Sequence, residues 1–82
     1  MNEPLNQGMP LSLAPANTPL GIVDVEHKAA AARLEALGLW KGDALHVSRR
    51  SRAGVMVQVA QREMWFPNQL ALAVRVETRA LH

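Results

Sequence analysis

Three histidines and seven carboxylates are the side chains with which this chain could hold a metal ion. No two histidines show a ligand spacing such as His-x₃-His on one helix. Glu26 and His27 are adjacent, and on an extended segment their side chains point to opposite faces. We therefore predict no dedicated metal site and no required cofactor. Zinc readily recruits exposed histidines and carboxylates, so Glu26, His27 and His46 are candidates for a weak site completed by water or a second chain.

The serines show no arrangement typical of a catalytic nucleophile. Ser12, Ser48 and Ser51 lack a glycine-flanked elbow, and no histidine–carboxylate arrangement is evident near them. The chain has no cysteine and no Gly-x₄-Gly-Lys-Ser/Thr phosphate loop. We also expect a barrel built from 82 residues to lack a small-molecule pocket, which typically measures about 300–1,000 Å³. The sequence therefore predicts a protein that is not an enzyme.

One basic cluster, formed by Arg49, Arg50 and Arg52, could bind nucleic acid. Trp65, further along the chain, could stack on a base of a nucleic acid that this cluster holds. Against this, the net charge is only +2, and one aromatic residue is fewer than stacking platforms usually have. We expect no nucleic-acid partner, and small-barrel nucleic-acid binding through this hairpin and Trp65 is the alternative function.

The segment Leu37-Gly38-Leu39-Trp40-Lys41-Gly42 has the pattern of a helix end followed by a tight turn. Gly38 is typical of the left-handed position after a helix, and Leu39 then re-enters the core. Trp40 is too large to be fully buried in such a turn, and exposed tryptophans are enriched at protein contacts. Trp40 therefore either contacts a partner or caps an open end of the barrel.

The remaining pattern predicts the elements that position these residues. Four of the five prolines lie in the first nineteen residues, so this stretch forms no long helix or central strand. The expected elements are strands at 11–13, 20–25, 44–49, 55–60, 63–66 and 72–77, a helix at 28–37, and one helical turn after Pro67. We expect a flexible leader at 1–10, one domain at 11–77 and a frayed end at 78–82.

These short strands predict a mainly β fold, a small β-barrel of five to six strands with one inserted α-helix. The predicted core consists of Val23, Val25, Leu34, Leu37, Leu39, Leu45, Val47, Val57, Val59, Met64, Phe66, Val74 and Val76. No apolar run approaches the roughly 18–20 residues that cross a bilayer, and the N-terminus lacks the pattern of a signal peptide. We therefore expect a cytoplasmic protein that is not inserted in the membrane.

The order of these elements resembles the ferrous-iron transport protein A (FeoA) family. The resemblance covers residues 11–77 and includes Leu11-Ser12-Leu13, Leu34-Glu35-Ala36-Leu37-Gly38-Leu39-x-x-Gly42, and Ala71-x-x-Val74-x-Val76. Members are small cytoplasmic SH3-like barrels thought to support the membrane GTPase that imports ferrous iron, FeoB. The resemblance thus implies an accessory protein that contacts the cytoplasmic part of a FeoB-type transporter at the inner face of the membrane. It leaves open whether the contact activates, inhibits or assembles the transporter.

The resemblance also directs attention to particular residues. Its partner-binding candidates are Leu39, Trp40, Lys41, Arg50 and Arg52, and it adds iron to zinc as an ion for the weak metal site. The hairpin loop departs from the family's common Ala-Pro-Leu-Gly-Asp-Pro, reading Arg50-Ser51-Arg52-Ala53-Gly54. A detached domain of a metal-dependent repressor, whose C-terminal barrel is similar, is a further interpretation. Weak self-association into a homodimer is also compatible with the sequence.

Overall fold

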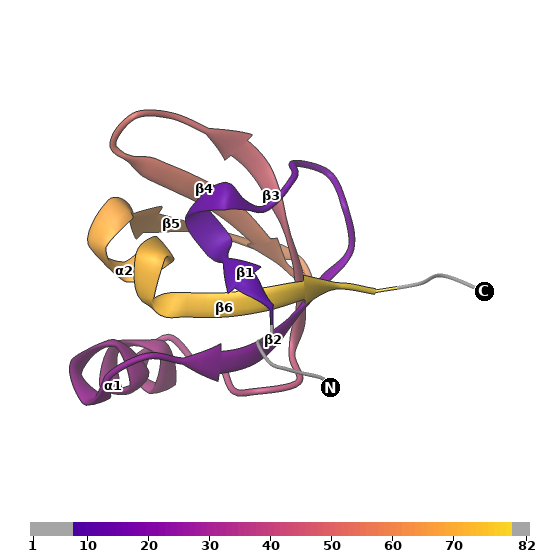
Figure 1. Cartoon of the computed structure of the whole chain (residues 1–82). Coiled ribbons are helices and arrows are strands. Elements are labelled where there is room, and N and C mark those ends of the chain that lie inside the picture. The colour runs from indigo at the N-terminus through magenta and orange to yellow at the C-terminus, as the bar shows by residue number, and fades with distance from the viewer. Residues whose placement is uncertain (1–7, 80–82) are drawn as a thin grey trace, which may run out of the picture.

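A computed structural model of the chain describes residues 8–79, which form one curled β-sheet with two helices (Figure 1). The strands are β1 (Met9–Pro10), β2 (Leu20–Val25), β3 (Ala44–Arg50), β4 (Gly54–Val59), β5 (Arg62–Pro67) and β6 (Val74–Thr78). The helices are α1 (Lys28–Ala36), α2 (Asn68–Ala73) and the 3₁₀ turn η1 (Leu11–Leu13). The predicted mainly β fold of short strands with one inserted helix is confirmed.

The strand order is β1-β6-β2-β3-β4-β5, and all neighbouring strands are antiparallel. Strands β2 to β5 follow one another as a meander, whereas β6 returns to pair with β2. Helix α2 connects β5 to β6 and packs against η1, β4 and β5. The helical turn predicted after Pro67 is therefore present, and it lies between the two ends of the sheet (Figure 1).

Strand β2 places its side chains differently from the prediction. Simple alternation puts Val23 and Val25 on the buried face, but the fully buried side chains are Leu20 and Ile22, and of the two valines only Val25 packs against the core. The cause is a register shift against β6 between Ile22 and Asp24, where Val23 is the extra residue. A bulge of this kind reverses which side chains face inward. Val23 is consequently only half-buried.

The N-terminal segment is a second correction. Residues Leu11–Leu13 form a 3₁₀ turn rather than an edge strand, and the edge strand is Met9–Pro10. Residues 1–7 and 80–82 lie outside the described residues, so the predicted leader and frayed end are untested there. Within the described part, the first strand begins at Met9, and Thr78 still belongs to β6.

The core confirms most of the predicted positions. The buried hydrophobic residues are Leu11, Ala14, Leu20, Ile22, Ala30, Leu34, Leu39, Leu45, Val47, Val55, Val57, Phe66, Leu70, Ala71, Ala73, Val74 and Val76. Val25, Leu37, Val59 and Met64 are partly buried against this cluster. Four of the nine additions come from η1 and α2, and the other five come from β2, α1, β4 and the loop after η1. Neither α1 nor α2 is long and apolar enough to cross a membrane, and no other described segment forms such a helix.

Candidate functional site

A surface groove of about 480 Å³ runs between helix α1, the end of β2 and the turn that follows the helix. Its floor is apolar and its rim is charged. The lining residues are Asp24, Val25, Ala31, Leu34, Glu35, Leu39, Trp40 and Lys41. The expectation that the chain has no space of this size was wrong. The sequence could not reveal the groove, because its walls belong to three separate elements that only packing brings together.

The turn beside this groove (residues 38–43, the Trp40 turn) begins with a complete Schellman cap on α1. The N–H of Gly38 donates to the carbonyl of Glu35 (2.9 Å), and the N–H of Leu39 donates to the carbonyl of Leu34 (3.0 Å). Gly38 has φ +82°, the left-handed value that this motif requires. Leu39 and Leu34 are both buried, which adds the hydrophobic contact that accompanies the cap.

The rest of the Trp40 turn is held by hydrogen bonds within the turn and to β2. The N–H of Trp40 donates to Asp43 Oδ2 (2.9 Å), and the N–H of Asp43 donates back to the carbonyl of Trp40 (3.1 Å). The N–H of Gly42, at φ +92°, donates to the carbonyl of Ile22 (2.7 Å) and ties the turn to β2. The backbone that carries Trp40 is therefore fixed before any partner arrives.

The three candidates in this turn have different surroundings. Leu39 is buried, with 1% of its surface exposed, and forms part of the groove's floor. Trp40 is 56% exposed and forms one wall. Lys41 Nζ lies 3.5 Å from Asp24 Oδ1, and this exposed ion pair marks the rim. A partner side chain entering the groove would meet an indole wall, an aliphatic floor and charges of both signs.

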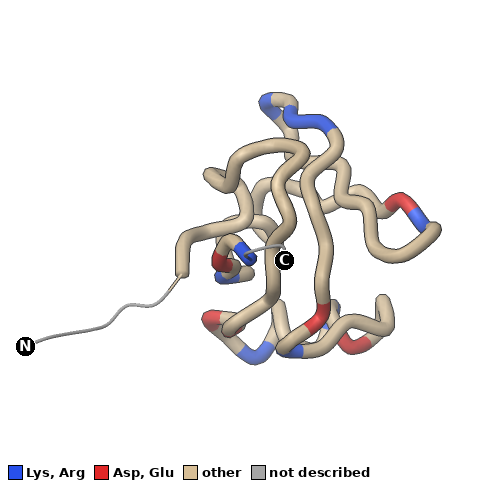
Figure 2. The backbone as a smooth tube through the Cα atoms, turned by 90° about the vertical axis from the view of Figure 1, so that its right-hand side faces the viewer, with Lys and Arg blue, Asp and Glu red and all other residues tan. Residues whose placement is uncertain are grey.

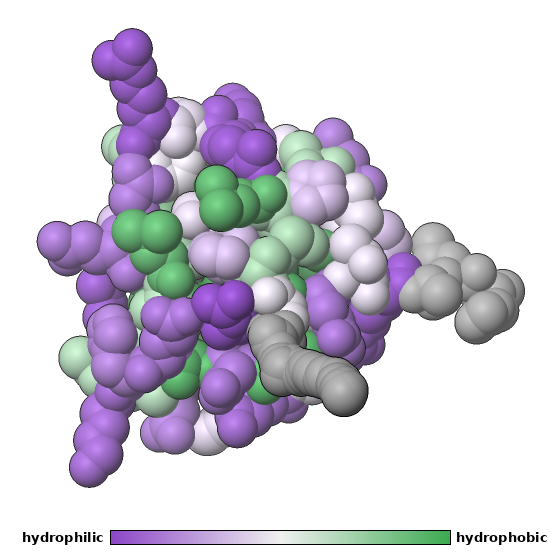
Figure 3. Space-filling view, in the orientation of Figure 1, coloured by the Kyte–Doolittle hydropathy of each residue, from purple (hydrophilic) through white to green (hydrophobic). Residues whose placement is uncertain are grey.

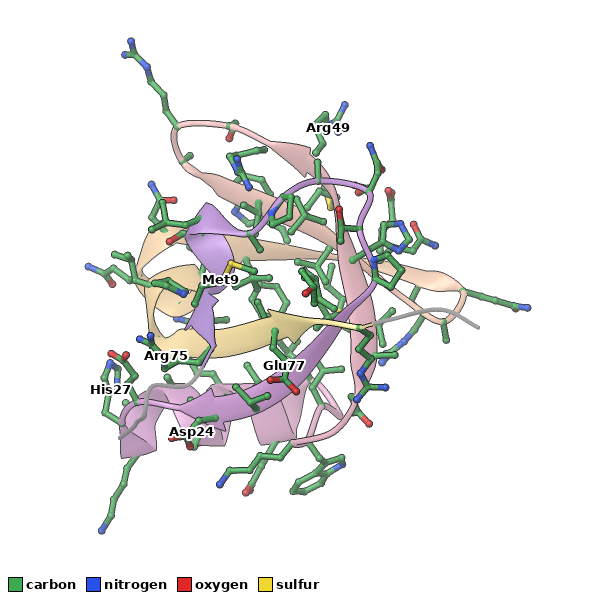
Figure 4. All side chains as sticks on the ribbon, turned by 45° about the vertical axis from the view of Figure 1, so that its right-hand side comes forward. Met9, Asp24, His27, Arg49, Arg75 and Glu77 are labelled. Atoms are coloured by element: carbon green, nitrogen blue, oxygen red, sulfur yellow. The ribbon has the colours of Figure 1, made fainter. Side chains whose placement is uncertain are left out.

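The other candidates, Arg50 and Arg52, lie at the opposite end of strand β3. The Trp40 turn precedes this strand, and the tip of the β3–β4 hairpin (residues 50–54, the hairpin tip) follows it. Seven extended residues span about 20 Å. Figures 1 and 4 show the hairpin and helix α1 at opposite sides of the molecule. The structure does not bring the two sets of candidates together in one groove.

Arginines lie on both faces of the β3–β4 hairpin beside its tip, which strict alternation along β3 does not explain. After the buried Leu45 and Val47, the residue expected to point inward is Arg49. The register against β4 shifts between Val47 and Arg49, and Arg49 and Arg50 are both exposed. Arg49 pairs with Met56, which in turn pairs with Trp65 on β5. The residues of the nucleic-acid alternative thus share one region, with Trp65 44% exposed.

Glu26 and His27 line one surface depression although opposite faces were expected for them, but the three metal candidates do not form a common site. Glu26 Oε2 accepts a hydrogen bond from Arg75 Nη1 at 2.6 Å, and His27 precedes the first turn of α1 (Figure 4). His46 lies on β3, in a separate surface depression with Asn17. Within residues 8–79, no three histidine, aspartate or glutamate side chains gather so that they could hold an ion. A weak metal site would therefore need ligands from water or a second chain.

The model of the FeoA domain matches the chain over residues 9–78, which include every described strand and helix. The chain belongs to the FeoA family. This membership associates it with ferrous-iron uptake and with a family of small accessory proteins. The predicted resemblance is confirmed, and the match begins at the edge strand β1. No curated protein sequence matches this FeoA chain significantly.

Solved structures agree with the family assignment. An iron uptake regulatory protein (FeoA) superimposes with a TM-score of 0.79 at 21% identity, over 89% of this chain and 100% of that one. The FeoA protein of Chlorobium tepidum gives 0.73 at 27% identity, over 88% and 71%. The manganese regulator SloR gives 0.79 at 12% identity, but this FeoA chain covers 34% of it. The likeness to the regulator is one of fold.

Proposed function

We propose that this FeoA-family chain is a non-enzymatic accessory protein of ferrous-iron uptake that binds the cytoplasmic part of a FeoB-type GTPase transporter. It acts on the cytoplasmic side of the membrane and needs no cofactor of its own. The observation that supports the proposal is the groove beside the Trp40 turn. One wall of this groove is the exposed Trp40, whose backbone is held in place by hydrogen bonds.

The physical argument concerns the cost of ordering a contact residue on binding. An aromatic side chain offers a large apolar surface with only two rotatable bonds, and a fixed backbone adds no loop to be ordered. Trp40 meets both conditions, because its N–H and carbonyl are each bonded to Asp43. The groove next to it accepts a side chain from the partner, while Lys41 and Asp24 on the rim supply charge complementarity.

The test is a titration of the intact chain with the isolated cytoplasmic domain of the transporter. Trp40→Ala should weaken binding by about 2 kcal/mol or more, the size expected for a hot spot, without loss of the folded state. The matched control is Trp65→Ala, which removes the other exposed tryptophan and should leave the affinity unchanged. Equal affinity of wild type and Trp40→Ala would remove the groove from the contact.

A second arm repeats the titration with excess single-stranded RNA at two salt concentrations. Transporter binding that RNA does not displace supports the accessory function. Tight RNA binding with a steep salt dependence and no transporter binding would favour the alternative function at Arg49, Arg50, Arg52 and Trp65. Sedimentation of the chain alone in the same buffers measures any weak homodimer.

A further inference from the structure

The hairpin tip carries a concentration of positive charge without counter-charges. Arg49, Arg50 and Arg52 are all exposed, and none of them forms an ion pair with a described residue. Figure 2 shows basic residues gathered on this hairpin, whereas the acidic residues lie elsewhere along the described chain. Three guanidinium groups at one protruding end fit an anionic partner, because each presents a planar set of donors that matches phosphate oxygens.

The tip is held against helix α2 rather than projecting freely. The N–H of Asn68 donates to the carbonyl of Ala53 (3.0 Å), and the Asn68 side-chain amide donates to the carbonyl of Arg52. The N–H of Ser51 also donates to the carbonyl of Gly54 (2.9 Å). The backbone that carries Arg52 is therefore fixed relative to α2.

Two leucines of η1 and α2 are exposed although these elements contribute other side chains to the core, and Leu72 lines a depression that also includes Glu26 and His27. Leu72 in α2 is 54% exposed and Leu13 in η1 is 70% exposed. Residues four apart lie on one face of a helix, so Leu72 shares its face with Asn68, which holds the tip. Elements η1 and α2 pack against each other. Figure 3 shows hydrophobic atoms over these two elements, with polar atoms around them.

We propose that this surface, formed by Arg50, Arg52, Leu13 and Leu72, docks on an anionic lipid bilayer. Arg49 lies on the other face of the hairpin, with Met56 and Trp65. The arginines would bind headgroup phosphates, and the leucines would enter the boundary between headgroups and acyl chains. A basic tip with exposed aliphatic side chains on the neighbouring elements can contact the headgroups and the acyl chains of a bilayer together. A nucleic acid is the less suitable ligand, because these leucines give it no stacking platform and Trp65 is the sole aromatic residue near the arginines.

Docking at this surface leaves the groove beside Trp40 free. The two surfaces lie at opposite ends of β3, so the chain could contact a lipid surface and a protein at once. Each arginine near an anionic surface contributes about fivefold to partitioning, which gives a weak and reversible association for the two arginines of this surface. Such an association becomes effective when a second contact already holds the chain near the membrane. The inference does not depend on the proposed function, since vesicles contain no transporter.

The test is co-sedimentation of the full chain with vesicles of equimolar phosphatidylglycerol and phosphatidylcholine, at low and at physiological salt. Arg50→Gln/Arg52→Gln should reduce partitioning about thirtyfold at low salt. The matched control is Lys28→Gln/Arg33→Gln, which removes the same charge from α1 at the other side of the molecule and should change partitioning less than threefold, about the loss expected from net charge alone. Leu13→Gln/Leu72→Gln should also lower partitioning, by about tenfold or more.

Three outcomes would overturn the inference. Equal partitioning to vesicles of phosphatidylcholine alone would show that charge does not direct the association. Equal losses in the two charge variants would show that net charge, rather than this surface, is responsible. Single-stranded RNA that binds more tightly than the vesicles and is lost in the Arg50→Gln/Arg52→Gln variant would assign the surface to nucleic acid. Circular dichroism of each variant confirms that the fold is retained.

Discussion

The Trp40 turn and the hairpin tip are the two loops at the ends of β3, and they are stabilised in different ways. The Trp40 turn is closed by a Schellman cap, by hydrogen bonds between Trp40 and Asp43 and by a buried leucine, and Gly42 ties it to β2. The hairpin tip has a hydrogen bond between Ser51 and Gly54 but no such anchor in the core, and α2 holds it through Asn68. The first loop thus presents a shaped apolar groove, whereas the second presents charge. The small barrel therefore presents two chemically distinct surfaces, one at each end of β3.

Among the variants that test this comparison, Leu39→Ala should lower the stability of the fold most. Leu39 is buried and anchors the Trp40 turn, so its truncation should lower the free energy of unfolding by about 2–5 kcal/mol. Trp40→Ala, one residue further on, should cost about 1 kcal/mol or less because more than half of that side chain is exposed. Urea denaturation followed by circular dichroism measures both. Equal losses would contradict the assignment of anchor and contact roles.

The next largest losses of stability should come from replacing one glycine in each loop, because the two loops need glycine for different reasons. At Gly54 an added Cβ would lie 2.2 Å from the carbonyl oxygen of Phe66, so Gly54→Ala should cost about 1–3 kcal/mol or more. At Gly42 there is open space, but φ is +92°, so Gly42→Ala should cost about 1–2 kcal/mol.

Asparagine provides the control for these two positions, because it tolerates positive φ better than alanine does. Gly42→Asn should therefore be more stable than Gly42→Ala. Gly54→Asn should be no better than Gly54→Ala, since the larger side chain meets the same backbone atoms. Thermal denaturation of the four variants measures the difference. If asparagine improved stability at Gly54 instead, lack of space would not be the reason for that glycine.

The accuracy of prediction differed between the two regions for physical reasons. The end of α1 was predictable from Gly38, because positive φ leaves little choice of residue. The burial of Ile22 was not, since it depends on one extra residue in β2, at Val23. The exposure of Arg49 agrees with the basic cluster expected from the sequence, but the extra residue at Ser48 that accompanies it was not predictable. Local alternation carries no signal for such bulges. The groove depends on the packing of α1 against β2, which is likewise absent from local patterns.

The smallest effect should come from the ion pair at the groove's rim. Lys41→Ala removes the contact with Asp24, and both side chains are exposed, so the free energy of unfolding should fall by less than about 0.5 kcal/mol. Binding to the cytoplasmic domain should weaken at low salt more than at high salt, because a rim charge acts mainly on association. A stability loss above 1 kcal/mol would show that the pair supports the turn.

The central claim is that the groove beside Trp40, and not the hairpin tip, contacts the transporter. Hydrogen exchange of the intact chain, with and without the isolated cytoplasmic domain, tests it most directly, because both loops are read in one experiment. The account predicts added protection in peptides covering residues 31–43 and none in peptides covering residues 51–53. Protection of the hairpin tip with no change at the Trp40 turn would contradict it.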